Sequence, residues 1–246
     1  MVRLVDYEAR RRAVLGAAIE RYIKHAQPVS SEDIAKQFRL SSATIRNIFA
    51  DLEEEGYLMH PYTSGGRIPT KKGYRYYVDV LVSQAELLEE EKEHIVGEFK
   101  QEIGRLEDIL DQTAGAISRI THYAGIASFL EWHDRFFYKG LNLILNQPEF
   151  QEVERIRLLV QMIEERQQLL KIINRDFKDD KIKIYVGEEL ECPGMDSCAL
   201  VVSSYKRKNQ PSGKIAVLGP MRMEYEHIIP TLEYISGVLT EVMDRT

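Results

Sequence analysis

The stretch 41-SSATIRNIFADL-52 decides the fold of the first third of the chain. Its serines offer an N-cap, and its large apolar residues recur at helical spacing, which predicts a helix with one buried face. The buried positions are Ile45, Ile48, Phe49 and Leu52. The opposite face is small and polar and carries Arg46 and Asn47, which can bond guanine and adenine in bidentate fashion in the major groove. This pattern is typical of a recognition helix.

Two further helices precede this stretch. An apolar stripe predicts a helix over 11–25, and a short second helix follows Ser30 or Ser31, either of which can cap it. A tight turn at Arg39 and Leu40 then completes a helix-turn-helix. A plain three-helix core with a solvated polar side is the alternative, because this arrangement is also common in proteins that bind no DNA.

A basic hairpin follows the predicted recognition helix. Gly56 ends the helix, residues 57–59 and 67–69 are predicted as strands, and 63-TSGG-66 is the turn between them. Such a hairpin is a wing suited to phosphate or minor-groove contact. Its candidate DNA-binding residues are Ser64, Arg67, Lys71 and Lys72. His60 is interpreted as a strand residue near the hairpin base rather than a ligand or switch, since no second metal-binding side chain lies at ligand spacing.

The distribution of charge also separates the first third of the chain from the rest. The 246 residues include 33 Lys and Arg against 39 Asp and Glu, a net charge of −6. Residues 1–80 nevertheless contain 13 basic and 10 acidic side chains. The division favours a basic module attached to an acidic body, and we expect weak non-specific DNA binding.

A long helical stretch follows Tyr76. Its apolar residues fall mostly three, four and seven apart with charged residues between them, which predicts a seam that can join two chains. The candidate dimerisation residues are Leu88, Ile95, Phe99, Ile103, Leu106 and Leu110. An amphipathic helix lying on its own domain is the alternative, because the glycines of this stretch each weaken an isolated helix by about 1 kcal/mol.

The remaining residues predict an α+β ending. Residues 132–145 and 148–174 have the periodicity of amphipathic helices, and residues 224–243 predict a final helix interrupted by Pro230. Short β-rich runs separated by turn residues predict three strands, at 181–187, 199–204 and 214–219. A sheet of three strands lies at the low end of independent stability.

Three blocks of motifs occur in order along the chain. They are 28-PVSS-31, 41-SSATIRN-47, 56-GYL-58, 63-TSGGRIPT-70 and 73-GYR-75, then 146-NQPEF-150, and finally 187-GEE-189, 203-SSY-205 and 219-GPMRMEY-225. In these motifs the chain resembles the HrcA family of heat-inducible transcription repressors. The first block matches without a gap from about Leu15 to Leu81, so the resemblance is specific.

The resemblance implies a homodimeric repressor that binds double-stranded DNA at an inverted-repeat operator upstream of chaperone genes, with a chaperonin promoting its active folded form. It places Thr44, Arg46 and Asn47 on the recognition helix and Arg67 on the wing. From side-chain chemistry we assign base readout to Arg46 and Asn47. Backbone positioning is assigned to Ser42, Thr44, Arg67, Lys71 and Lys72.

The family's C-terminal domain is GAF-like, and the chain departs from the usual pattern there. Between about Ser128 and Phe136 it lacks most of a segment that usual members possess, including strands of the sheet and an inserted dimerisation subdomain. We expect a shortened member with an α+β fold, in which the loss of these strands weighs against a small-molecule pocket. Its expected parts are a winged-helix DNA-binding domain at 1–76, a helical linker with a dimerisation helix at 77–125, and a reduced GAF-like domain at 126–246.

The sequence contains no recognised catalytic constellation. Phosphate-binding loops, a zinc-protease motif and a serine nucleophile elbow are missing, so we expect no enzyme. Cys192 and Cys198 have no second Cys/His pair and are interpreted as turn and strand residues, so we expect no metal site and no other cofactor. No apolar run is long enough to span a membrane, and the N-terminus has no apolar signal core, which predicts a cytoplasmic protein.

The sequence therefore predicts a sequence-specific DNA-binding repressor of heat-shock genes that acts as a dimer. A winged-helix module that binds a protein partner and no DNA is the alternative.

Overall fold

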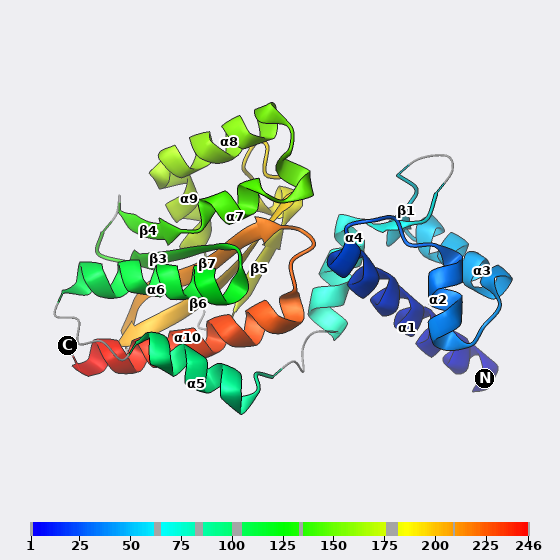
Figure 1. Cartoon of the computed structure of the whole chain (residues 1–246), viewed down its shortest axis with the longest axis horizontal. Helices are drawn as coiled ribbons and strands as arrows, with labels where there is room; N and C mark the ends of the chain where they lie inside the picture. The colour runs from blue at the N-terminus through cyan, green and yellow to red at the C-terminus, as the bar shows by residue number, and fades with distance from the viewer. Residues whose placement is uncertain are drawn as a thin grey trace. The chain divides into compact units, whose positions relative to one another are not determined.

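The computed structural model of the chain describes residues 2–61, 65–81, 86–99, 105–132, 135–175, 182–208 and 210–245. Its internal contacts divide the chain into two compact units, residues 1–84 and 85–246 (Figure 1). Each unit buries a core of its own.

The first unit consists of helices packed around one another and a small hairpin (Figure 1). Its elements are α1 (Val2–His25), α2 (Ser31–Phe38), α3 (Ser42–Glu54), β1 (Leu58–Met59), β2 (Ile68–Pro69), α4 (Lys71–Tyr76) and the π-helical turn η1 (Tyr77–Leu81). The four apolar residues predicted to face inward from α3 are each no more than 3% exposed. The winged helix predicted from the sequence is confirmed.

The second unit is built on a five-stranded sheet in the order β4-β3-β7-β6-β5, in which all neighbours are antiparallel. The strands are β3 (Ala124–Phe129), β4 (Phe136–Lys139), β5 (Lys183–Val186), β6 (Cys198–Arg207) and β7 (Gln210–Pro220). The helices are α5 (Glu89–Glu98), α6 (Leu106–Thr121), α7 (Leu141–Leu145), η2 (Pro148–Phe150), α8 (Val153–Glu164), α9 (Arg166–Ile173), η3 (Gly187–Leu190) and α10 (Tyr225–Arg245).

Helices cover both faces of this sheet (Figure 1). On one face α6 packs on β3 and β4, α10 packs on β6, and α5 contacts both of these helices. A Cβ atom on Gly125 would lie 2.3 Å from the carbonyl oxygen of Ala114, so α6 approaches β3 at backbone distance. On the other face residues of α7 to α9, such as Ile144 and Leu159, form one core cluster with Leu200 of β6. Because β6 is covered on both faces, its side chains are apolar at successive rather than alternate positions.

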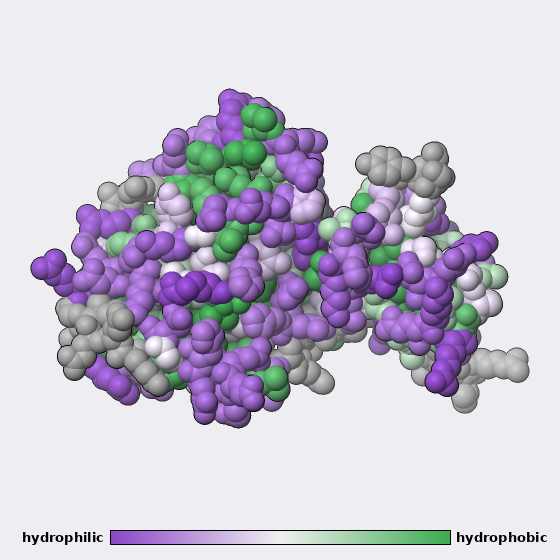
Figure 2. Space-filling model, viewed as in Figure 1, coloured by the Kyte–Doolittle hydropathy of each residue, from purple (hydrophilic) through white to green (hydrophobic). Residues whose placement is uncertain are grey.

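The visible surface of the second unit is mostly hydrophilic, but hydrophobic residues gather over α8 (Figure 2). Val153, the first residue of α8, is 80% exposed. The helix α8 is therefore amphipathic, as predicted, with Leu159, Met162 and Ile163 buried. Its first residue, however, leaves apolar surface exposed to solvent.

The structure corrects the expectation of one long helix after Tyr76. The described residues give two helices, α5 and α6, and the apolar stripe of α6 faces its own sheet: Ile109, Leu110, Ala114 and Ile117 are buried. The alternative weighed from the sequence, an amphipathic helix lying on its own domain, is the arrangement found for α6.

Three further expectations about the second unit are wrong. Residues 132–145 are not one helix, because residues 136–139 pair with β3 as β4. Residues 148–174 break into η2, α8 and α9, with the second break at Glu165, whose ψ of 62° is not helical. Pro230 does not interrupt α10, since it lies in the second turn and removes only one hydrogen bond of the helix.

The three strands predicted from the sequence are confirmed as β5, β6 and β7, and the structure adds β3 and β4. The sheet is thus larger than the three strands expected. The strands β3 and β4 are adjacent in both sequence and sheet, and the segment that the chain was expected to lack falls in the connection between them.

Candidate nucleic-acid interface

The helix α3 begins at a serine cap. The Ser41 hydroxyl accepts a hydrogen bond from the Thr44 N–H at 3.1 Å, and its oxygen lies 2.8 Å from the Thr44 hydroxyl. This satisfies one of the backbone donors that a helix leaves free at its start. Ser42 is the first helical residue, so of the two serines predicted as caps Ser41 provides the cap.

Arg46 and Asn47 lie on the exposed face of α3. Within the described parts of the chain, neither side chain makes a hydrogen bond or an ion pair. The neighbouring Ala43 and Ala50 are also exposed. A face of this kind can approach base edges closely and still offers one guanidinium and one amide as unused donors and acceptors.

Polar contacts from α1 fix α3 at its C-terminal half. The Tyr7 hydroxyl donates to Asp51 Oδ2 at 2.5 Å, and Arg11 Nη2 lies 2.5 Å from Glu55 Oε2. The hydrogen bond to Asp51, together with burial, raises the pKa of Tyr7, so this phenol remains a donor. The orientation of the recognition helix therefore rests on side chains outside it.

The helix α2 is held in a similar way. The Ser30 hydroxyl donates to Asp33 Oδ2 at 2.8 Å and accepts from the Asp33 N–H at 3.2 Å, and Arg21 of α1 lies 3.0 Å from Asp33. The hydrogen bond from Ser30 lowers the pKa of Asp33, although burial acts against this, and Arg21 lowers it further. The end of α2 turns at Arg39, which has a φ of 53°.

The wing is anchored through its backbone. The strands β1 and β2 pair Leu58 with Pro69 and Met59 with Ile68. Just before β2, the Arg67 N–H donates to the Val29 carbonyl at 2.9 Å, and the Val29 N–H donates to the Arg67 carbonyl at 2.8 Å. A Cβ on Gly66 would lie 2.2 Å from this Val29 oxygen, so the position requires glycine. Ser64, predicted at the wing tip, lies outside the described residues.

The side chain of Arg67 is paired within the protein. Its Nη2 atom lies 2.9 Å from Glu53 Oε2 of α3, its Nη1 atom contacts His60 Nε2, and His60 Nδ1 lies 2.6 Å from Glu53 Oε1. We call Glu53, His60 and Arg67 the wing cluster. Burial raises the pKa of Glu53, but the hydrogen bond to His60 and the charge of Arg67 outweigh it and lower the pKa overall. Glu53 was not a candidate from sequence, because it lies seven positions before His60 and in another element.

The two candidate lysines lie at the start of α4. Lys72 Nζ donates to the carbonyl of Glu55 at 2.7 Å and lies 4.4 Å from the centre of the Tyr57 ring. A cation there is favourable because the C-terminus of α3 carries a partial negative charge. Lys71 is half-buried. Lys72 therefore stabilises the junction of α3 and the wing in this structure, while its predicted contact with phosphate remains a prediction.

The candidate dimerisation residues are distributed between core and surface. Ile95 and Leu110 are buried within the second unit, Phe99 and Leu106 are half-buried, and Ile103 lies outside the described residues. Leu88 is 70% exposed. The structure does not align these side chains as one continuous exposed seam, since two of them contribute to the core of their own unit.

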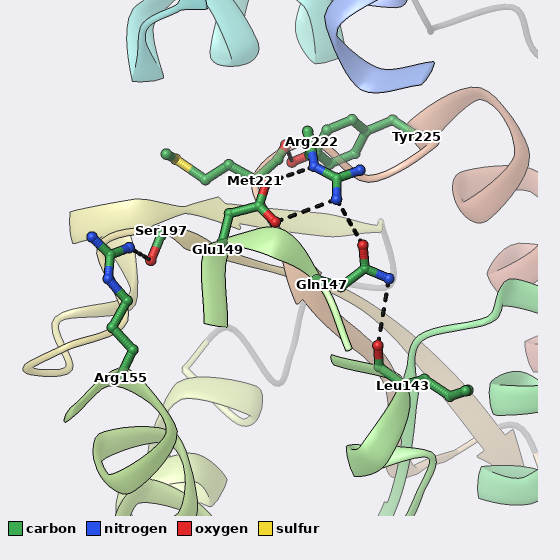
Figure 3. Close-up of polar contacts among 8 residues, drawn as sticks. All are labelled: Leu143, Gln147, Glu149, Arg155, Ser197, Met221, Arg222 and Tyr225. Atoms are coloured by element: carbon green, nitrogen blue, oxygen red, sulfur yellow. Dashed lines mark hydrogen bonds and ion pairs between the residues drawn. The ribbon is translucent and has the colours of Figure 1, made fainter. Parts of the chain in front are cut away.

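In the second unit, two of the motif blocks meet at an ion pair. Arg222 Nε donates to Glu149 Oε1 at 2.6 Å and Arg222 Nη2 donates to Gln147 Oε1 at 2.7 Å, as Figure 3 shows. The Gln147 amide in turn donates to the Leu143 carbonyl at 3.4 Å, and the Tyr225 hydroxyl donates to the Met221 carbonyl at 2.7 Å. This network connects the turn after β7 to the segment around η2.

The described residues offer little catalytic or metal chemistry. They contain no group of three or more His, Cys, Asp or Glu side chains placed to hold a metal ion. Cys192 and Cys198 are both free, and burial raises the pKa of each thiol, which disfavours the reactive thiolate. No helix among the described residues is long and apolar enough to cross a membrane.

Known proteins similar to this chain share both of its units. Residues 7–86 match the family model "Winged helix-turn-helix transcription repressor, HrcA DNA-binding", and residues 127–229 match "HrcA protein C terminal domain". A crystal structure of a hypothetical protein is similar in fold, with a TM-score of 0.78 at 19% identity over 96% of this chain and 98% of that one.

Two curated relatives are named heat-inducible transcription repressor HrcA. The protein of Moorella thermoacetica is 27% identical over 339 residues, which cover 97% of this chain and 98% of the relative. That of Acetivibrio thermocellus is 27% identical over 339 residues and covers 97% of each chain. These alignments are longer than the 246 residues of this chain, so the relatives contain residues that have no counterpart here.

Both family models therefore fall on the units that the structure separates, and they follow one another in the same order. Since the two models together span most of the chain, it belongs, as a shortened member, to the HrcA family, whose members are transcription repressors and not enzymes.

Proposed function

We propose that this protein represses transcription of heat-shock chaperone genes by binding a specific DNA sequence in front of them. The observation that carries the proposal is the outward face of α3, where Arg46 and Asn47 are exposed beside two alanines and lack partners among the described residues. Such a helix fits the major groove, where arginine and asparagine discriminate guanine and adenine. The relatives named as heat-inducible repressors support the choice of target genes.

The operator is an inverted repeat bound by a homodimer, with one winged helix on each half-site. Two-fold symmetry in a DNA-binding dimer requires half-sites related by the same symmetry. Of the residues predicted at the dimer contact, Leu88 supports this proposal best because it is 70% exposed. Static light scattering of wild type and Leu88→Asp would test the contact: we expect a dimer that weakens in the variant, and a wild-type monomer at micromolar concentration would exclude it.

A chaperonin is the proposed protein partner, and the cytoplasm, where the bacterial chromosome lies, is the proposed location. The dependence on a chaperonin follows from the family resemblance. In thermodynamic terms, a partner that binds the folded protein in preference to the unfolded chain raises the concentration of the DNA-binding form by mass action.

Selection of bound sequences from random double-stranded DNA tests the DNA-binding function directly. We expect an inverted repeat, whose spacing then fixes the geometry of the dimer. Arg46→Ala and Asn47→Ala should each lose about 1–3 kcal/mol of discrimination at one position of the half-site. Lys24→Ala is the matched control, since Lys24 is an exposed cation at the end of α1 and its removal should leave the base preference unchanged.

The opposite result is equally clear. The proposed DNA-binding function fails if wild type selects no sequence and its affinity for DNA does not change with salt concentration. Contacts with phosphates release counterions, so a DNA-binding protein must show an affinity that falls as salt rises. A winged helix that docks on a protein would give that result while remaining folded.

A further inference from the structure

The turn between α2 and α3 carries an arginine in a backbone conformation that usually belongs to glycine. Arg39 is the C-cap of α2, and its φ of 53° and ψ of 41° lie in the left-handed region. Its N–H and that of Leu40 both donate to the carbonyl of Ala35, the latter at 3.1 Å. A Cβ atom is unfavourable in this region, so glycine is the residue most often found at such helix ends. The chain therefore keeps a long cationic side chain where its backbone favours none.

The fold itself does not explain the side chain of Arg39. It is exposed, and it makes no hydrogen bond or ion pair with the residues that the structure describes. A cation at the end of α2 is favourable to the helix dipole, but Lys36 in the last turn already provides one. Non-glycine residues in strained backbone conformations cluster at functional sites, so this departure is typical of a residue that contacts a ligand.

Two of the cations predicted to position the protein on phosphates are engaged within the protein. Arg67 is held in the wing cluster, where its Nη2 atom lies 2.9 Å from Glu53 Oε2. Lys72 donates to the carbonyl of Glu55 at 2.7 Å. The guanidinium of Arg39, by contrast, has its donors available, and a phosphate can accept two of them at once.

The place of Arg39 at the DNA follows from the helix-turn-helix arrangement. The helices α2 and α3 pack against each other, and Arg39 lies two residues before Ser41, the N-cap of α3. When a recognition helix lies in the major groove, its N-terminal residues face the base edges and the preceding helix crosses the phosphate backbone. The turn between the two helices is then at the edge of the groove, where phosphates are the nearest groups.

We propose that Arg39 binds a backbone phosphate at the edge of the major groove and so sets the depth at which Arg46 and Asn47 meet the bases. The inference rests on the proposed DNA-binding function and adds a residue to its interface. The hydrogen bonds to Ala35 on one side and the Ser41 cap on the other fix the backbone around Arg39, so the contact orders only one side chain. Phosphate contacts carry no sequence information, which makes Arg39 a positioning residue.

The experiment measures the affinity of the full chain for its selected operator by fluorescence anisotropy over a series of salt concentrations. Arg39→Gly removes the guanidinium and suits the left-handed backbone, so we expect this variant to fold. Arg39→Lys keeps the positive charge on the same backbone. Circular dichroism verifies that each variant is folded.

Two matched controls separate the phosphate contact from other effects. Ala26→Gly makes the same backbone change after the end of α1, where Ala26 has a φ of 52°, but removes no charge. Arg12→Ala removes an exposed cation of α1. Its neighbour Arg11 pairs with Glu55, the C-cap of α3, so this part of α1 lies toward the C-terminal end of α3 and away from the turn.

For Arg39→Gly we expect weaker operator binding and a slope of log affinity against log salt that is smaller by about 0.9, which corresponds to the loss of one phosphate contact. The ratio of wild-type to variant affinity should then fall about three- to fourfold between about 50 and 200 mM salt. Arg39→Lys and both controls should retain the wild-type slope. The base preference of Arg39→Gly, measured by selection from random DNA, should remain that of wild type.

Three results would overturn the inference while leaving the proposed function intact. One is an Arg39→Gly variant with the affinity and salt slope of wild type. Another is an Arg12→Ala variant whose slope falls as much, since any surface cation would then account for the loss. The third is a changed base preference in Arg39→Gly, which would assign Arg39 to a base and not to a phosphate. Failure of wild type to select any operator would instead overturn the proposed function, and this inference with it.

Discussion

The Arg222 guanidinium binds both carboxylate oxygens of Glu149, with Nε at 2.6 Å from Oε1 and Nη2 at 3.3 Å from Oε2. The two residues are 73 positions apart, and both side chains are largely buried, Arg222 to 11% exposure and Glu149 to 20%. A bidentate pair in this setting fixes geometry as well as contributing energy.

We expect Arg222→Ala to destabilise the second unit by about 1–3 kcal/mol, because it leaves the Glu149 carboxylate and the Gln147 amide oxygen without their donor. Urea unfolding followed by circular dichroism measures this. Arg157→Ala is the control, since Arg157 pairs with Glu154 on the surface and should contribute nothing measurable. Equal midpoints for the two variants would contradict the structural role of Arg222.

The cap of the recognition helix gives a second prediction. Ser41→Ala removes the acceptor of the Thr44 N–H and should lower the stability of the first unit by about 1 kcal/mol. Ser42→Ala, one position later, should change stability less, because Ser42 is the first helical residue and not the cap. Hydrogen exchange at the backbone amides of α3, measured on the full chain as the temperature is raised, reports the stability of the first unit and distinguishes the two variants. The prediction fails if Ser42→Ala opens α3 more.

The third prediction concerns two adjacent glycines in the wing. A Cβ on Gly66 would lie 2.2 Å from the Val29 carbonyl oxygen, whereas a Cβ on Gly65 would meet nothing within 4 Å. Gly66→Ala should therefore push the wing away from Val29, weaken operator binding, and destabilise the first unit by about 1–3 kcal/mol. Gly65→Ala should leave both properties near the wild-type values. Melting temperature and operator affinity are the measurements, and a harmless Gly66→Ala would show that the Val29 bridge does not position the wing.

The fourth prediction concerns pH and Asp33. The hydrogen bond from Ser30, acting against burial, and the charge of Arg21 lower the pKa of this carboxyl in the folded state. A depressed pKa contributes stability above the unfolded value, which is near ~3.9, and the contribution is lost as the pH falls through the folded value. Asp33→Asn should thus be less stable than wild type at neutral pH, and the difference should shrink on acidification. The midpoints of urea unfolding for the two proteins, measured across this pH range, test the prediction. A difference in stability that grew at low pH would contradict it.

Much of the first unit could be predicted from the sequence because its signals are local. Caps and helical periodicity each act within a few residues, and together they define α2 and α3. The side-chain partner of Arg67 could not be predicted in the same way. Glu53 lies in another element, and only the packing of α3 against the hairpin brings its carboxylate within 2.9 Å.

The second unit was harder to predict for a different reason. Residues 124-AGIASF-129 are buried on both faces, so β3 has no alternation of polar and apolar residues to distinguish it from a loop or a helix end. In 136-FFYK-139 the strand is short, and its neighbours suggest helical spacing. Both strands are defined by their hydrogen bonds to neighbouring strands. Residue propensities along the chain carry no information about such partners. The Arg222–Glu149 pair, likewise, follows from tertiary structure alone.

The pairing of β3 with β7 also determines when the second unit can finish folding during synthesis. The Ser128 hydroxyl donates to the Lys214 carbonyl across 86 residues of chain, and β3 keeps that neighbour along its whole length. A nascent chain can therefore fold its DNA-binding unit early, while the central sheet cannot form until its last strand, β7, has left the ribosome. Contacts of such long range form slowly and leave apolar strands exposed in the meantime. We thus expect the supply of finished repressor to be limited by sheet closure in the second unit and not by the winged helix.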